Sequence, residues 1–168
     1  MSGSIEPGAP GKTRKVSFWR WLNSTSRRSF IVIPPLVIGA EYLLGGGNIP
    51  FQPWGMPLLV WGYSQYRLGG GFRTRHGGGG PGIDVPPDRI VDTGIYCYIR
   101  NPMYLGHMIF HLALAITFKS WIALAILAAH IVWFERRVRE DEDRLEGMFG
   151  EAYRAYKART KRWIPFVY

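Results

Sequence analysis

The chain of 168 residues contains one cysteine, Cys97, which excludes an intrachain disulfide framework and a metal cluster built on cysteine thiolates. The glycine runs at 69–71 and 77–80 do not form a Gly-x-Gly-x-x-Gly turn between a strand and a helix. A Rossmann-type cofactor site is therefore not supported. We interpret the two glycine runs as a flexible loop.

Acidic residues are scarce, with 12 Asp and Glu against 21 Lys and Arg, so the net charge is +9. Such a balance can indicate nucleic-acid binding, but no helix-turn-helix, zinc-finger or aromatic RNA-binding signature accompanies it. Attraction to anionic lipid headgroups explains the basic residues more simply. We expect a membrane bilayer, and no nucleic acid, as the partner.

Hydrophobic side chains are abundant, at 47% of the chain, and they are concentrated in four blocks: 29–44, 51–68, 103–118 and 121–134. Each block is near the lower limit of about 17 residues for a helix that spans a bilayer. Basic residues precede the first block, separate the second from the third and follow the fourth, whereas the connection at 45–50 carries no charge. The positive-inside rule predicts this alternation for four spans with both termini cytoplasmic.

The expected fold is therefore all-α: a polytopic membrane protein with about four transmembrane helices and a cytoplasmic C-terminal helix. Residues 1–28 are predicted to form a basic cytoplasmic tail with an interfacial segment at 18–22, and residues 29–168 the membrane domain. The expected location is a bacterial inner membrane. A soluble helical bundle is the alternative, because short apolar blocks can also be buried helices.

Two histidines, His107 and His111, are spaced i, i+4 on one face of a predicted helix. This spacing suits a metal or haem pair, but no third ligand motif is visible, and a polar pair can also line a helix interface or a cavity. We therefore predict no metal site. His76 and His130 are isolated in the sequence.

Polar turn chemistry runs directly into an apolar helix at Arg100-Asn101-Pro102. Pro102 favours the first turn of a helix and pushes Asn101 out of helical geometry. Free backbone N–H groups and the positive end of the helix dipole are then expected beside Arg100, where an anionic ligand would bind well. The alternative is that Arg100 and Asn101 simply cap the helix.

Residues 135–156 contain no proline, which predicts that the fourth block continues into the cytoplasm as a helix. One stripe at helical spacing carries Val138, Leu145, Phe149 and Tyr156. Glu142 lies on the same stripe, and an inward-facing carboxylate needs a cationic or N–H partner, either a ligand or an arginine in a salt bridge. Three other acidic residues are expected on a solvated face: Glu140, Asp143 and Glu146.

Together these segments resemble a known family. Residues 91–106, Val-Asp-Thr-Gly-Ile-Tyr-Cys-Tyr-Ile-Arg-Asn-Pro-Met-Tyr-Leu-Gly, are similar to the pattern Leu-Val-x-x-Gly-x-Tyr-Arg-Tyr-x-Arg-His/Asn-Pro-x-Tyr-x-Gly. Residues 141–156 and 162–165 are similar to Glu-Glu-x-x-Leu-x-x-x-Phe-Gly-x-x-Tyr-x-x-Tyr and Arg-Trp-x-Pro. These patterns are typical of the integral-membrane superfamily of isoprenylcysteine carboxyl methyltransferases and phospholipid N-methyltransferases. The resemblance covers about residues 86–165.

The resemblance implies an S-adenosylmethionine pocket that faces the cytoplasm, between the last two spans and the C-terminal helix. By matching position, the cofactor-binding residues are Ile90, Val91, Gly94, Tyr96, Arg100, Asn101, Pro102, Tyr104 and Glu142. The residues with implied catalytic roles are Glu142, Arg100 and Tyr104. The chain departs from the family pattern at three positions, because Cys97 replaces an Arg, Asn101 stands where His is frequent, and Asp141 replaces a Glu.

The implied activity is methyl transfer to an amphiphilic or lipid acceptor at the cytoplasmic membrane face, like that of the isoprenylcysteine carboxyl methyltransferases. Alternatives are N-methylation of a phospholipid amine, a non-catalytic scaffold or lipid-binding protein of the same fold, and a haem- or metal-binding membrane protein. A carboxylate acceptor needs no base, whereas an amine acceptor must lose a proton, for which Glu142 or Tyr104 is the candidate.

Overall fold

The computed structural model describes residues 24–80 and 85–164. In chain order its helical elements are α2 (Thr25–Arg27), the π-helical turn η1 (Arg28–Val32), α3 (Ile33–Leu44), η2 (Pro53–Gly55), α4 (Met56–Gly77), η3 (Gly94–Cys97), α5 (Pro102–Phe118), α6 (Trp121–Phe149) and α7 (Glu151–Arg159). The all-helical architecture is confirmed. Of the predicted tail at 1–28, residues 1–23, with the interfacial segment, lie outside the described residues, whereas 25–28 are helical with Thr25 and Ser26 buried, so this part is not a tail.

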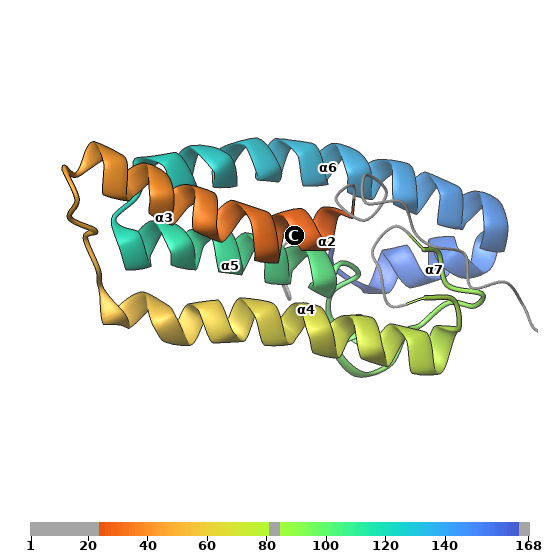
Figure 1. Cartoon of the computed structure of the whole chain (residues 1–168). Helices are drawn as coiled ribbons and strands as arrows, with labels where there is room; N and C mark the ends of the chain where they lie inside the picture. The colour runs from red at the N-terminus through yellow and green to blue at the C-terminus, as the bar shows by residue number, and fades with distance from the viewer. Residues whose placement is uncertain (1–23, 81–84, 165–168) are drawn as a thin grey trace, which may run out of the picture.

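Four helices, α3, α4, α5 and α6, lie side by side in an elongated bundle (Figure 1). α5 packs against α4, α6 and α3. The C-terminal part of α6 extends past the start of α5, and α7 folds back beside this extension (Figure 1). Among the described residues, no helix combines the length and the apolar character that crossing a bilayer requires.

α4 and α5 approach each other closely at Gly62 and Gly106. A Cβ on Gly62 would lie 2.6 Å from the backbone nitrogen of Phe110, and one on Gly106 would lie 2.7 Å from the carbonyl oxygen of Gly62. Only glycine fits at both positions, because side chains there would push the two helix backbones apart. This contact fixes how the start of α5 lies against α4.

The glycines at 69–71 belong to α4 and not to a loop, so the prediction of a flexible loop there is wrong. Gly69 and Gly70 are buried, and a Cβ on Gly69 would lie 3.4 Å from the side chain of Met103. Packing against the first turn of α5 offsets the low helix propensity of this run. α4 ends at Gly77, and Gly78 follows with φ of 75°.

The turn between α5 and α6 explains an acidic residue in the first apolar block. Lys119 adopts the left-handed conformation after α5, and the Ser120 hydroxyl caps α6 by accepting a hydrogen bond from the Ala123 nitrogen at 3.0 Å. The same hydroxyl donates to Glu41 Oε1 at 2.6 Å. Glu41 therefore ties α3 to this turn.

The helix that begins at Trp121 ends at Phe149, so the prediction of one helix continuing to residue 156 is wrong at its last turns. Gly150 has φ of 55° and ψ of −128°, a conformation that L-residues disfavour, and it reverses the chain direction. α7 consequently folds back with Tyr153 and Tyr156 buried. This reversal brings the C-terminal residues to the start of α5.

Candidate functional site

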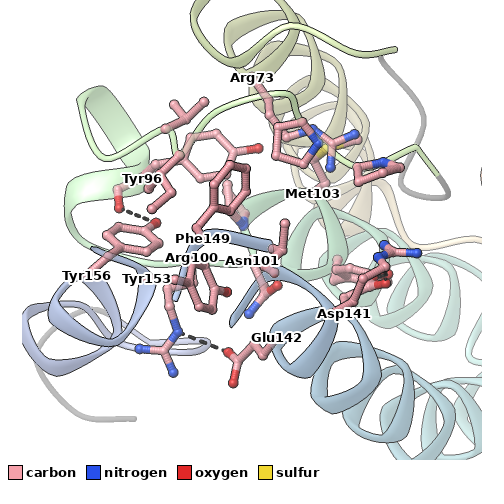
Figure 2. A pocket seen from close by; sticks show the side chains of 18 residues that line it. Arg73, Tyr96, Arg100, Asn101, Met103, Asp141, Glu142, Phe149, Tyr153 and Tyr156 are labelled. Carbon is pink, nitrogen blue, oxygen red and sulfur yellow. Dashed lines mark hydrogen bonds and ion pairs between the residues drawn. The ribbon is translucent and has the colours of Figure 1, made fainter. Parts of the chain in front are cut away.

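A cavity lies where the segment 85–101, the start of α5, the extension of α6 and α7 meet (Figure 2). The two sequence motifs, which are some 40 residues apart in the chain, both contribute to its wall. Beneath it lies a core cluster of Met103, Tyr104, Phe134, Val138 and Trp163. The cavity thus rests on packed side chains from α5 and α6.

The segment 85–101 is anchored to the end of α4 by backbone hydrogen bonds. The nitrogens of Asp88 and Arg89 donate to the carbonyl oxygen of Gly77 at 2.7 and 3.1 Å. The guanidinium of Arg73 donates to the carbonyl oxygens of Gly80 and Val85 at 3.1 and 2.8 Å. These bonds hold the segment 85–101, the first wall of the cavity, in place although its helical structure is limited to the short η3.

Tyr96 links α4 to α7 across the cavity. Its hydroxyl donates to the Gly69 carbonyl oxygen at 3.2 Å, and its own carbonyl oxygen accepts from the Tyr156 hydroxyl at 2.8 Å (Figure 2). Burial raises the pKa of Tyr96 to about 12, although the charge of Arg73 acts in the opposite direction. The phenol is therefore neutral at physiological pH and acts as a hydrogen-bond donor.

Arg100 is held between α6 and the residues that follow α7. Its backbone nitrogen donates to the Lys161 carbonyl oxygen at 2.8 Å, beside an isolated parallel bridge between Ile99 and Lys161. Its Nε donates to Glu142 Oε1 at 2.9 Å, and its Nη1 donates to the Lys157 carbonyl oxygen at 3.0 Å. The side chain therefore fastens the C-terminal residues to α6 (Figure 2).

Glu142 has two arginine partners. Arg162 Nη2 lies 2.8 Å from Oε2, in addition to the contact with Arg100, and only 3% of the Glu142 side chain is exposed. Burial alone would raise the pKa of Glu142, but the hydrogen bonds and charges of Arg162 and Arg100 outweigh it and lower the pKa. Of the two partners that the sequence left open, an arginine salt bridge is present.

Asp141, beside Glu142 on α6, accepts a hydrogen bond from the Tyr104 hydroxyl at 2.6 Å. Arg144 donates to its other oxygen at 2.7 Å. The chain thus places a carboxylate from α6 directly against a phenol from the first turn of α5. Asp141 was considered from sequence only as a departure from the family pattern, and it lines the cavity.

The start of α5 has the geometry that Pro102 predicts. Asn101 precedes the helix with φ of −122° and ψ of 49° and makes no side-chain cap, since its Nδ2 donates to the Arg162 carbonyl oxygen at 3.3 Å. The amides of Met103 and Tyr104 therefore have no capping side chain from this residue. Both residues line the cavity, so the positive end of the α5 dipole faces it.

The structure brings together eight of the nine residues expected to bind the cofactor, and these line the cavity: Ile90, Val91, Tyr96, Arg100, Asn101, Pro102, Tyr104 and Glu142. Gly94 does not line it. Gly94 has φ of 59°, and a Cβ there would lie 2.6 Å from the ring of Phe72, so this glycine serves the turn and its packing on α4. His107 and His111 do not line the cavity either.

Sequence reasoning missed several residues of the site. Besides Asp141, the cavity is lined by Arg73, Arg144, Tyr153 and Tyr156, and Arg162 holds Glu142 from outside the lining. Tyr153, Tyr156 and Arg162 stand at fixed positions of the second motif, which was the available signal for them. Arg73 follows the second apolar block, in a polar part of the sequence where no pattern marks it as a site residue.

Comparison with known proteins agrees with these motifs. Residues 82–152 match the family described as "Phospholipid methyltransferase". The chain is 29% identical over 80 residues to the protein-S-isoprenylcysteine O-methyltransferase of Schizosaccharomyces pombe, a match covering 46% of this chain and 34% of that protein. It is 32% identical over 81 residues to protein-S-isoprenylcysteine O-methyltransferase B of Arabidopsis thaliana, covering 47% of this chain and 41% of that protein.

The matched region therefore spans well under half of the length of these relatives. The family match at residues 82–152 contains the segment before α5, all of α5 and all of α6, which build much of the cavity. The family match thus includes the parts of the chain where the two motifs meet in space. On these grounds residues 82–152 match the family of phospholipid methyltransferases, and the chain is similar over about 80 residues to protein-S-isoprenylcysteine O-methyltransferases.

Proposed function

We propose that this protein transfers a methyl group from S-adenosylmethionine to a lipid or amphiphilic acceptor at the cytoplasmic face of a membrane. The observation that carries the proposal is that the two family motifs, around Arg100 and around Glu142, line one cavity. S-adenosylmethionine would supply an activated methyl group on a positively charged sulfur.

The donor set of the cavity fits the amino-acid end of this cofactor. The neighbouring carboxylates of Asp141 and Glu142 suit an ammonium group and hydroxyls, because ionised carboxylates only accept hydrogen bonds. The first turn of α5, with the amides of Met103 and Tyr104 and the positive dipole end, suits a carboxylate. Charges of both signs therefore lie where a zwitterionic group needs them.

Aromatic side chains suit the remainder of the cofactor. Tyr96, Phe149, Tyr153 and Tyr156 all line the cavity and come from the first wall, α6 and α7. Aromatic faces stack on flat heterocycles and attract cations within about 6 Å of the ring centroid. These rings would orient an adenine and favour a positively charged sulfur while keeping water away from it.

The membrane part of the proposal is supported by the outer surface of the bundle. Large apolar side chains are exposed on several helices and connections: Leu36, Leu43, Leu44, Trp54, Val60, Trp61, Leu68 and Trp121, each at 56% or more. A surface of this kind is typical of a protein–membrane or protein–protein contact. An acceptor with an apolar tail would then meet the cofactor cavity from within the bilayer.

The roles proposed for this chain's residues follow from their contacts. Arg100 and Glu142 position the C-terminal residues that complete the cavity, and Glu142 contributes one of the two carboxylates. The Tyr104 hydroxyl, which donates a hydrogen bond to Asp141, would act on the acceptor from the start of α5. A carboxylate acceptor would need no proton removal, whereas an amine acceptor would use this Tyr104–Asp141 pair or Glu142.

The test is incubation of the purified protein with methyl-labelled S-adenosylmethionine and a total lipid extract, followed by mass spectrometry of whatever acquires label. Binding is measured separately by calorimetry with the demethylated product. Asp141→Asn is expected to weaken binding about tenfold, whereas Asp143→Asn, on the exposed face of α6, leaves it unchanged. Absence of both binding and label would overturn the proposed function.

A further inference from the structure

The outer surface of the bundle changes from apolar to charged along α4 and α6. On α6 the exposed side chains between Trp121 and Trp133 are all apolar, and the next exposed side chain is that of Arg136. On α4 the exposed side chains at 56–63 carry no charge, and the next exposed side chain is that of Arg67. Each helix therefore has an apolar outer surface that ends at an exposed arginine.

The first helix of the bundle repeats this pattern in the opposite chain direction. Arg28 in η1 is exposed, and the exposed side chains that follow it at 31–44 carry no charge. Glu41 is only partly exposed, lies one turn from the end of α3, and accepts the hydrogen bond of the Ser120 hydroxyl at 2.6 Å. On α3, α4 and α6 alike, the first exposed charge is an arginine.

The opposite ends of these helices meet at what we call the loop end, which comprises residues 42–56 and 117–121 (left in Figure 1). The Gln52 nitrogen donates to the Thr117 carbonyl oxygen at 2.6 Å and joins the two connections. The three apolar surfaces therefore start from one common level.

The loop end suits the surface of a bilayer and not its interior. Its connection at 45–52 is not helical, and Lys119 is exposed. Irregular backbone and an ammonium group are both costly in hydrocarbon. Trp54 and Trp121 are 81% and 80% exposed, and tryptophan is enriched at membrane–water interfaces. We therefore expect the loop end at one surface of a bilayer and the three arginines at the other.

The distance from the loop end to these arginines is short. At the rise of an α-helix it is about 22 Å along α6, from Trp121 to Arg136, and about 16 Å along α4, from Met56 to Arg67. Along η1 and α3 it is at most about 24 Å. The hydrocarbon core of a typical bilayer is about 30 Å thick. The apolar surface is therefore shorter than that core by about 6 Å or more.

A bundle that is shorter than the bilayer core cannot compensate by tilting, because tilt reduces the height that it spans. The remaining responses are thinning of the bilayer, snorkelling of flanking side chains and association between copies. Snorkelling moves a charged group outward but adds no apolar surface. Thinning removes the difference on all three helices at once.

We propose that the lipid partner of this protein is a thin bilayer: the apolar surface of α3, α4 and α6 binds phospholipids with short acyl chains in preference to long ones. Arg28, Arg67 and Arg136 then lie at the headgroups of the cytoplasmic side, where the positive-inside rule expects basic residues. The proposal rests on the membrane location that is part of the proposed function, and it does not depend on methyl transfer.

The test is a competition between phospholipids of different chain length for the surface of the purified full chain. The protein is reconstituted in vesicles that mix brominated dioleoylphosphatidylcholine, which quenches tryptophan fluorescence, with unlabelled dimyristoleoyl-, dioleoyl- or dierucoylphosphatidylcholine. The seven tryptophans of the chain supply the signal, and recovery of fluorescence gives the relative affinity of each unlabelled lipid. The dimyristoleoyl lipid is expected to bind about three- to tenfold more tightly than the dierucoyl lipid.

Matched variants locate the effect. Arg67→Leu removes the exposed charge where the apolar surface of α4 ends, and it is expected to reduce the preference for short chains by about half or more. Arg75→Leu makes the same chemical change about 12 Å further along α4, also at an exposed position, and should keep the full preference. Arg136→Leu repeats the comparison on α6.

Equal binding of the three lipids, tightest binding of either longer lipid, or equal effects of Arg67→Leu and Arg75→Leu would overturn the proposal. A protein that stays dissolved without detergent and does not enter vesicles would overturn it together with the membrane part of the proposed function. Methyl transfer is assayed separately with the labelled cofactor. A preference for short chains without methyl transfer would reject the proposed activity alone, and methyl transfer without such a preference would reject the thin bilayer alone.

Discussion

Arg100 and Glu142 form an ion pair at 2.9 Å that joins the segment before α5 to the C-terminal part of α6, with 10% and 3% of their side chains exposed. Arg162 completes the arrangement from the C-terminal side of the same carboxylate. Three segments that are far apart in the chain therefore meet at one buried negative charge. The cavity lining around Arg100 and Glu142 depends on these ion pairs.

Replacing Glu142 by Gln should destabilise the protein by about 3 kcal/mol, because two partly buried guanidinium groups lose their counter-charge. Affinity for S-adenosylmethionine should fall as well, since the same residue lines the cavity. Denaturant unfolding and calorimetric titration measure the two effects. Glu146→Gln, whose partners Arg154 and Lys157 lie on the surface, is the matched control and should change little. Equal effects of the two substitutions would contradict the role of Glu142.

Acid should weaken the fold through the same carboxylate. The pKa of Glu142 is lowered from 4.5 in the folded protein, so the unfolded chain binds the proton more tightly. The stabilisation is complete above the unfolded value of 4.5 and is lost as pH falls through the folded value. Unfolding free energies measured from pH 6 downward should decline less steeply in Glu142→Gln than in Glu140→Gln, which alters an exposed neighbour. Parallel curves for the two variants would refute this.

Tyr104→Phe should remove the hydrogen bond to Asp141 and leave a buried carboxylate with one donor fewer. The expected loss is about 1–3 kcal/mol of unfolding free energy, measured by denaturant titration. If the hydroxyl also acts on the acceptor, the rate of labelled methyl transfer should fall more than cofactor affinity does. Tyr42→Phe, at an exposed position on α3, controls for removal of a hydroxyl. A fully stable, fully active Tyr104→Phe protein would exclude both roles.

Gly106→Ala should be strongly destabilising, because the new methyl group would lie 2.7 Å from the backbone of Gly62 and Tyr66 on α4. A cost of about 1–3 kcal/mol is expected for forcing apart packed elements. Gly71→Ala makes the same chemical change on α4 where nothing lies within 4 Å, and it should stabilise by up to about 1 kcal/mol. Thermal unfolding of the two variants checks the contrast, and a neutral Gly106→Ala would refute the close packing.

The predicted topology can be tested by cysteine labelling in intact cells. In a Cys97→Ser background, a cysteine at the exposed position Asn48 should react with an impermeant reagent, whereas one at the exposed position Arg75 should not. The reason is that the 45–50 connection carries no charge and the opposite end of the bundle is basic. The reverse labelling pattern would place the cavity on the outer side.

Local sequence patterns predicted the parts of this fold that depend on neighbouring residues. Pro102 marked the start of α5, and the apolar stripe predicted the burial of Val138 and Glu142, which are 0% and 2% exposed. Patterns of this kind depend only on helical periodicity and on the fixed geometry of proline. The family resemblance, in turn, predicted nine cofactor-binding residues, of which eight line one cavity.

What the sequence could not provide is the set of contacts made across the chain. The partners of Glu142 lie 42 and 20 residues away, and no periodicity selects them from among 21 basic residues. Gly69 looked like part of a loop because glycine has a low helix propensity. Packing on Met103, which the sequence does not reveal, stabilises α4 at this residue. His130 looked isolated because its neighbour His111 is on another helix.

The reversal at Gly150 has a consequence for the order in which the protein can become functional. Ribosomes synthesise chains from the N-terminus. Tyr156, which lines the cavity, and Lys157, whose carbonyl oxygen accepts a hydrogen bond from Arg100, therefore emerge only after α3 to α6 have been synthesised. A nascent chain that ends at Phe149 would contain α5 and α6, which contribute to the cavity, but not α7, which supplies Tyr153 and Tyr156. Binding of a ligand in the cavity is thereby postponed until α7 has been synthesised, so the proposed cofactor should bind only chains that extend past Tyr156.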